Sequence, residues 1–196
     1  MTTEPAPEMR IVVIAGSVRP GNYTGRAVAL LVDEFSKDKR VMIEIFDPRQ
    51  MELPLPGSGA ESPSAMRMAE AVSKASGVVL ATPEYHGGFS SVMKLVIENL
   101  GFPSVLAGKT VALLGVAAGE IGAIKSLEQL RSVCSHVGAV VLPGPVSVPR
   151  VREVFDEDGT CLDPEVEARI RSVAAKLTGY IESRTCSRDN QEEMAR

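Results

Sequence analysis

A short loop at residues 16–25 carries side chains suited to binding a phosphate group. Ser17, Arg19, Asn22 and Thr24 offer hydroxyl, guanidinium and amide donors, and the guanidinium of Arg19 can bind two phosphate oxygens at once. The loop follows five apolar residues, 11–15, and precedes a helical pattern. Free backbone N–H groups and the positive end of a helix dipole would therefore meet an anion at this point.

The charge pattern supports this interpretation, but the motif itself leaves an alternative open. No acidic residue occurs between positions 8 and 33, so no carboxylate repels an anion here. The loop is neither G-x-G-x-x-G nor G-x-x-x-x-G-K-[ST]. An ordinary strand-to-helix turn, in which Asn22 or Thr24 caps the helix, explains the same residue types.

A second loop, residues 82–88 with the sequence TPEYHGG, is typical of a shaped backbone rather than of an acid–base set. Its glycines would let a flat heteroaromatic ring approach the free N–H and C=O groups. Tyr85 would lie against such a ring or pack against protein, and Glu84 would be structural or face solvent. We favour a loop hydrogen bond for His86 over catalysis. A third loop, residues 117–120, is small enough to leave room for a ring.

Alternating strand and helix patterns place these loops. Strands are expected at residues 10–15, 41–46, 77–82, 109–116 and 139–142, and helices at 22–37, 64–75, 90–100, 121–137 and 164–182. Five apolar strands alternating with helices predict a doubly wound α/β fold, with a five-stranded parallel sheet in the order 2-1-3-4-5. Ligands bind such sheets at the carboxyl ends of strands one and three, which brings the three loops together.

Length and composition limit the function classes. We expect 196 residues to form a single domain, with residues 1–9 and 183–196 as flexible tails. A net charge of −4 argues against a nucleic-acid surface, and no apolar run is long enough to span a membrane. The start MTTEPAPEMR lacks an apolar signal core, and the three cysteines fit reduced thiols, so we expect a cytoplasmic protein. With two histidines and no cysteine pair at zinc spacing, no metal site is expected.

Other residues that could do chemistry have simpler explanations. Cys134 falls on the apolar side of a helix and is expected in the core. His136 lies at a helix end, and Arg150 and Arg152 are expected in solvent. The helix expected at 90–100 carries apolar residues on more than one stripe, which predicts a twofold homodimer.

Two stretches, GSVRPGNYTGRAVAL and TPEYHGGFSSVMKLVIENLG, resemble the NAD(P)H-dependent FMN reductases of the flavodoxin-like superfamily, which include chromate, azo and quinone reductases. The usual family patterns are close to G-S-x-R-x-x-S-x-N and P-E-Y-N-x-S-x-P-G-x-L-K-N-x-I-D. His86 replaces the usual Asn, and Ser90-Ser91 replaces the usual Pro-Gly. The resemblance covers about residues 10–180, with strands, helices and loops in the expected order.

The resemblance implies that Ser17 and Arg19 contact the phosphate of FMN and that loop 83–88 holds the flavin ring mainly through backbone groups. No catalytic side chain is then required, because the flavin carries the chemistry. NADPH or NADH would reduce the FMN, which would in turn reduce a quinone-like, azo, metal or free-flavin acceptor. A homodimer or tetramer is implied. The expected FMN-binding residues are Ser17, Arg19, Asn22, Tyr23, Thr24, Pro83, Glu84, Tyr85, His86, Gly87, Ala117, Ala118 and Gly119.

Two other functions remain open from sequence. A flavodoxin-like electron carrier would bind FMN without turning over nicotinamide, but acidic surfaces and ring-shielding Trp are typical of it, and this chain has no Trp. A flavin-free regulatory or scaffolding dimer would keep the fold, but it would not need the Ser17/Arg19 loop.

Overall fold

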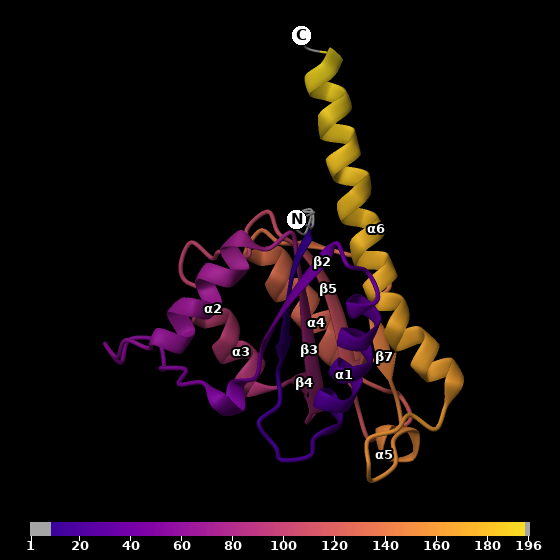
Figure 1. Ribbon diagram of the computed structural model, residues 1–196. Helices are drawn as coiled ribbons and strands as arrows, with labels where there is room; N and C mark the ends of the chain where they lie inside the picture. The colour runs from indigo at the N-terminus through magenta and orange to yellow at the C-terminus, as the bar shows by residue number, and fades with distance from the viewer. Residues whose placement is uncertain (1–8, 195–196) are drawn as a thin grey trace, which may run out of the picture.

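The computed structural model describes residues 9–194, with side chains described as far as residue 184. Within this part of the chain, a parallel sheet forms the centre of the molecule (Figure 1). The strands are β1 (Met9–Ala15), β2 (Val41–Phe46), β3 (Gly77–Tyr85), β4 (Gly88–Phe89), β5 (Thr110–Val116), β6 (Val140–Val141) and β7 (Val146–Val148).

Helices connect the strands and cover both faces of the sheet (Figure 1). They are α1 (Tyr23–Ser36), α2 (Pro63–Lys74), α3 (Ser91–Glu98), α4 (Ile124–His136), α5 (Val151–Val154) and α6 (Pro164–Met194), with a short 3₁₀ turn at Pro48–Gln50. Side chains cap several of them: Ser62 and Ser90 accept hydrogen bonds from the backbone of the first turns of α2 and α3.

The strand order β2-β1-β3-β5-β6 confirms the predicted order 2-1-3-4-5, since β5 and β6 are the fourth and fifth expected strands. All four neighbouring pairs along this order are parallel. The order reverses between β1 and β3, so the loops that follow these two strands open side by side at the carboxyl edge of the sheet.

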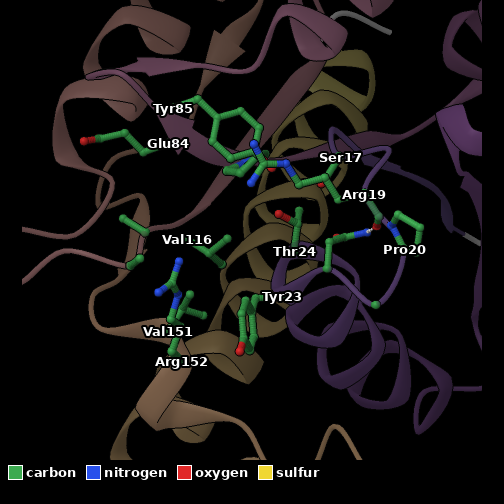
Figure 2. Close-up of a pocket in the computed structure, with 15 residues that line it drawn as sticks. Ser17, Arg19, Pro20, Tyr23, Thr24, Glu84, Tyr85, Val116, Val151 and Arg152 are labelled. Carbon is green, nitrogen blue, oxygen red and sulfur yellow. Dashed lines mark hydrogen bonds between the residues drawn. The ribbon is translucent and has the colours of Figure 1, made fainter. Parts of the chain in front are cut away.

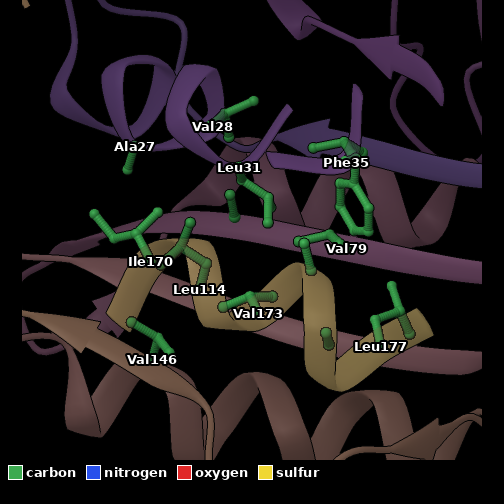
Figure 3. Packing of buried hydrophobic residues seen from close by; sticks show 14 of the residues in the cluster. Ala27, Val28, Leu31, Phe35, Val79, Leu114, Val146, Ile170, Val173 and Leu177 are labelled. Carbon is green, nitrogen blue, oxygen red and sulfur yellow. The ribbon is translucent and has the colours of Figure 1, made fainter. Parts of the chain in front are cut away.

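Two apolar layers hold the sheet. Helices α1 and α6 pack on one face, and Figure 3 shows Leu31 and Phe35 of α1 against Val79 of β3 and Val173 of α6. Helices α2, α3 and α4 cover the other face, where Val12 and Ile14 of β1 are buried. Alternate residues of β1 therefore pack into the two layers, as expected for a parallel sheet with helices on each side.

Cys134 of α4 is fully buried in the second layer, and burial raises the pKa of its thiol to about 12. The interpretation of Cys134 as a core residue is confirmed.

The fifth expected strand consists of two pieces. The strand predicted at 139–142 is β6, and after Pro143-Gly144-Pro145 the chain returns to the same neighbour, β5, as β7. The sequence patterns predict no strand after residue 142, so they miss β7 at Val146–Val148. Prolines on either side of these residues hid three positions that continue the parallel ladder at the edge of the sheet.

Other boundaries also differ from the predictions. Strand β3 continues to Tyr85 and turns back as β4, because the hairpin pairs Glu84 with Phe89. Met9, expected in a flexible tail, is buried in β1. Helix α6 continues beyond the predicted end at Glu182 to Met194, and Figure 1 shows it extending away from the sheet. No Gly or Pro follows Gly179 to stop it.

No helix among the described residues is both long and apolar enough to cross a membrane. Residues 1–8, the rest of the first expected tail, lie outside the described residues, as do residues 195 and 196.

Candidate functional site

A cavity of about 310 Å³ opens where the loops after β1, β3 and β5 meet (Figure 2). This is the edge at which the sheet order reverses, so the fold itself places the cavity. Its lining consists of Ser17, Arg19, Pro20, Gly21, Asn22, Tyr23, Thr24, Pro83, Glu84, Tyr85, Val116, Ala117, Ala118, Val151 and Arg152.

Asn22 shapes the first loop as the N-cap of α1. Its Oδ1 accepts a hydrogen bond from the N–H of Gly25 at 2.7 Å, and its Nδ2 donates to the carbonyl of Arg19 at 2.7 Å. The capping alternative is therefore correct for Asn22, whose amide is engaged within the loop. The cap fixes the start of α1 and directs its first N–H groups at the cavity.

The buried hydroxyl groups of Ser17 and Thr24 are the feature of the site that best indicates its ligand. The two residues are only 2% and 1% exposed, and neither hydroxyl oxygen has a hydrogen-bond partner among the described residues. A buried hydroxyl without a partner is costly. Two such hydroxyls in one cavity, beside the positive end of α1, form a set of donors that fits a phosphate.

Gly16 and Ser90 join the first loop to the second. The Ser90 hydroxyl donates to the carbonyl of Gly16 at 2.5 Å and accepts from the N–H of Met93 at 3.0 Å. The N–H of Ser90 donates to Oγ1 of Thr82 at 3.1 Å. A Cβ on Gly16 would lie 2.7 Å from Met93 Cε and 2.9 Å from the Ala81 carbonyl oxygen, so this close approach requires glycine.

The second loop is a tight hairpin tied to α4. His86 and Gly87 both have positive φ, 52° and 76°, as the turn between β3 and β4 requires. A Glu84 carboxylate oxygen accepts from the N–H of Ser126 at 3.3 Å, and Gln129 donates to the carbonyl of Gly87 at 3.1 Å. Glu84 therefore caps α4, which has no side-chain cap of its own.

Arg19 and Tyr85 meet across the cavity. The guanidinium carbon of Arg19 lies 4.4 Å from the centre of the Tyr85 ring, within the range of a cation–π contact. Figure 2 shows the Arg19 side chain reaching from the first loop toward this ring. The contact sets the cation of the first loop beside the aromatic side chain of the second.

The chain after β7 closes the remaining side of the cavity. The N–H of Ala117 donates to the carbonyl of Val148 at 2.9 Å, and the N–H of Val151 donates to the carbonyl of Ala117 at 3.0 Å. The N–H of Arg150 donates to the carbonyl of Gly119 at 3.1 Å. The third loop and α5 therefore form one hydrogen-bonded unit, which brings Arg152 into the wall.

Ten of the predicted site residues line one cavity. His86, Gly87 and Gly119 do not line it: His86 is an exposed turn residue, and Gly119 accepts the bond from Arg150. Sequence reasoning missed Pro20, Gly21, Val116, Val151 and Arg152 as lining residues. The expectation that Arg152 is exposed to solvent is confirmed, but this exposed side chain also lines the cavity. The apolar alternation of Val146 and Val148 was the available signal that this segment rejoins the sheet. No group of three or more potential metal ligands occurs among residues 9–184.

Comparison with known proteins shows the family of this chain. A model of the family "NADPH-dependent FMN reductase" matches residues 9–153. The chain is 32% identical over 181 residues to an NADPH azoreductase of Bacillus sp. (strain OY1-2), an alignment that covers 89% of this chain and 96% of that protein. It is 22% identical over 181 residues to a 2-hydroxy-1,4-benzoquinone reductase of Burkholderia sp, with 90% and 98% covered.

Among solved structures, the fold is similar to that of FerB, a flavoenzyme NAD(P)H:(acceptor) oxidoreductase from Paracoccus denitrificans. The TM-score is 0.75 at 20% identity, and the match covers 89% of this chain and 98% of that chain. At this identity the likeness shows the fold alone.

Proposed function

This chain belongs to the NADPH-dependent FMN reductase family, and we propose that it passes two electrons from NADPH through bound FMN to a flat quinone-like or azo acceptor. FMN is the cofactor and NAD(P)H the reductant of this FMN-dependent oxidoreductase. The observation that carries the assignment is the pair of buried, unpartnered hydroxyls of Ser17 and Thr24 in the cavity at the start of α1.

The residues present fit FMN. Ser17 and Thr24 would donate to the phosphate, and the free N–H groups at the start of α1 would add to them. With the phosphate at this end, the ring would lie toward the hairpin of Pro83–Tyr85 and the small residues Ala117 and Ala118. When bound, the flavin supplies the two-electron chemistry, and the protein supplies a binding site, an orientation and electrostatics.

The proposed electron transfer requires no acid or base from the side chains of the site. The Glu84 carboxylate is engaged with α4, and His86 lies outside the cavity lining. We therefore assign no side chain as acid or base in the electron transfer. The Tyr85 ring and the Val116 and Val151 side chains would keep water from part of the ring, while the open mouth would admit nicotinamide and acceptor in turn.

The choice of acceptor follows from this shape and from relatives whose names specify an azoreductase and a benzoquinone reductase. A small flat acceptor needs only the exposed face of the ring, whereas a protein partner would need a docking surface. Free flavin and metal ions are the further acceptors to be compared in the assay.

Initial-rate kinetics test this proposal. NADPH and a substituted 1,4-benzoquinone are varied together, and a shared site predicts parallel double-reciprocal lines, as in a ping-pong mechanism. Intersecting lines would contradict alternate occupation of one site. Bound FMN without turnover of any small acceptor would instead favour an electron carrier.

We also propose that the protein works as a homodimer in the cytoplasm. The surface left apolar by the fold supports the first part: Ile121, three residues before α4, and Ile124, the first residue of α4, are 72% and 49% exposed. The unpaired cysteines Cys134 and Cys161 suit a reducing compartment.

A further inference from the structure

Arg152 is a second cation in the cavity, on the wall away from the phosphate loop. It belongs to α5 and lines the cavity together with Val151. Figure 2 shows its guanidinium on the same side as Glu84 and Val116, and Ser17, Arg19 and Pro20 lie on the other. A phosphate held by Ser17 and Thr24 would therefore leave Arg152 at the ring end of a bound FMN.

The backbone that carries Arg152 is well fixed. Its neighbour Val151 is 3% exposed and hydrogen-bonded to Ala117, and Val154 and Phe155 are buried in the core beside α1. The Phe155 ring lies 6.4 Å from the ring of Tyr23, centre to centre. Buried neighbours and backbone hydrogen bonds thus hold the backbone beside Arg152, and the exposed side chain of Arg152 lines the cavity from there.

The charges around Arg152 are unbalanced. Arg150 has a counter-ion in Glu120 at 3.2 Å, whereas no carboxylate forms an ion pair with Arg152 in the part of the chain that the structure describes. The Glu84 carboxylate on the same side of the cavity keeps its negative charge, but it accepts from the N–H of Ser126 and forms no ion pair with Arg152. The ring end of the cavity therefore holds a guanidinium that is not ion-paired.

Reduction of bound FMN would place a negative charge on the flavin ring, beside the guanidinium of Arg152. Breaking the C4–H bond of the reduced nicotinamide delivers a hydride, which is two electrons and one proton, to the flavin ring. The nicotinamide becomes a cation, and the previously neutral ring gains one negative charge. A guanidinium beside the ring stabilises that charge more than it stabilises the neutral oxidised ring.

We propose that Arg152 binds reduced FMN in preference to oxidised FMN and so raises the reduction potential of the bound flavin. This inference rests on the proposed function, because it requires FMN in the cavity with its phosphate at Ser17 and Thr24. It assigns to Arg152 a role in tuning the cofactor, separate from the anchoring role of the first loop.

The test compares R152A with R150A, a neighbouring substitution that removes a guanidinium outside the cavity lining. FMN dissociation constants are measured by titrating the apoproteins, and midpoint potentials by anaerobic equilibration with reference dyes. For R152A we expect the affinity for oxidised FMN to stay within about threefold of wild type. Reduced FMN should bind about tenfold more weakly, so the two-electron potential falls by about 30 mV.

Two further variants make the outcome decisive. R152K keeps the charge and should retain most of the potential, whereas R152Q keeps a polar but uncharged side chain and should behave as R152A does. R150A should leave both quantities unchanged. An unchanged potential in R152A and R152Q, or equal weakening of oxidised and reduced FMN, would overturn the proposal for Arg152. Failure of the wild-type protein to bind FMN would instead overturn the proposed function.

Discussion

The guanidinium of Arg19 stacks on the ring of Tyr85, with its carbon 4.4 Å from the ring centre. One residue comes from the loop after β1 and the other from the end of β3, so the contact joins the two loops that the reversal of strand order brings together. The stacked guanidinium keeps its N–H groups free at its edges, because the ring occupies only its face. Arg19 can therefore hold Tyr85 and an anion at once.

Removal of Arg19 should weaken FMN binding without unfolding the protein. Arg19 is exposed, and a charge-assisted hydrogen bond contributes about 1.5–3 kcal/mol, so Arg19→Ala should lower FMN affinity about tenfold or more. Titration of both apoproteins with FMN measures this. Riboflavin, which lacks the phosphate, should bind both variants weakly, and equal FMN dissociation constants would contradict a phosphate contact by Arg19.

Thr24→Val should have opposite effects on cofactor binding and on stability. The buried hydroxyl has no partner among the described residues, so replacing it by a methyl group removes a desolvation cost and leaves the melting temperature of the apoprotein unchanged or higher. The same change removes a phosphate donor and should weaken FMN binding about tenfold. Thr24→Ser is the matched control and should bind FMN nearly as well as wild type. A Thr24→Val protein that loses stability and retains full FMN affinity would show that the hydroxyl serves the fold.

His86 should tune the site rather than perform the chemistry. Its φ of 52° is the conformation that Asn adopts more readily than most residues, which accounts for Asn at this position in the family pattern. His86→Asn should therefore keep flavin reduction within about tenfold, or about 1.4 kcal/mol of barrier. His86→Val should destabilise the hairpin, because a β-branched residue is strained at positive φ. A thousandfold loss in His86→Asn with FMN still bound would identify His86 as catalytic.

The homodimer prediction can be tested at the exposed residues of α4. Helix α3 turns Val96 and Ile97 into its own core, and Val92 and Leu95 are half-buried, so it offers less free apolar surface than its sequence suggests. Light scattering at micromolar concentration should give about twice the chain mass of 20.9 kDa. Ile124→Asp should shift this toward the monomer, whereas Leu162→Asp, at a still more exposed position before α6, should not. A wild-type mass near that of a single chain would count against the dimer.

The sequence was sufficient where a pattern has one structural solution. Apolar strands, such as residues 11–15 and 111–116, alternate with amphipathic helices, and this pattern predicts a parallel sheet and its strand order. The strand order then predicts which loops meet at the carboxyl edge of the sheet. For the same reason Ser17, Thr24 and Tyr85 could be placed at one site before any contact was known.

The remaining features depend on contacts between distant segments. The alternation of Val146 and Val148 is the one signal for β7, and three residues between prolines are too few to predict a strand from it. The position of Arg152 on α5, beyond β7, could therefore not be derived. The cap that Glu84 provides for α4 joins residues 42 positions apart, and the bond from Ser90 to Gly16 spans 74. Both hydrogen bonds depend on the direction in which the side chain points, and residue type alone does not specify that direction.

Anaerobic stopped-flow mixing of the FMN-loaded protein with NADPH is the most direct test of the central claim. The visible absorbance of oxidised flavin should disappear in a single turnover, with a primary isotope effect when stereospecifically deuterated NADPH is used, and added quinone should restore it. The Thr24→Val protein, loaded at saturating FMN, should be reduced at a similar rate, because the phosphate contact anchors the cofactor and takes no part in the transfer. If neither NADPH nor NADH bleaches the bound flavin of the wild-type protein, the chain is not a nicotinamide-dependent reductase, and the electron-carrier function takes its place.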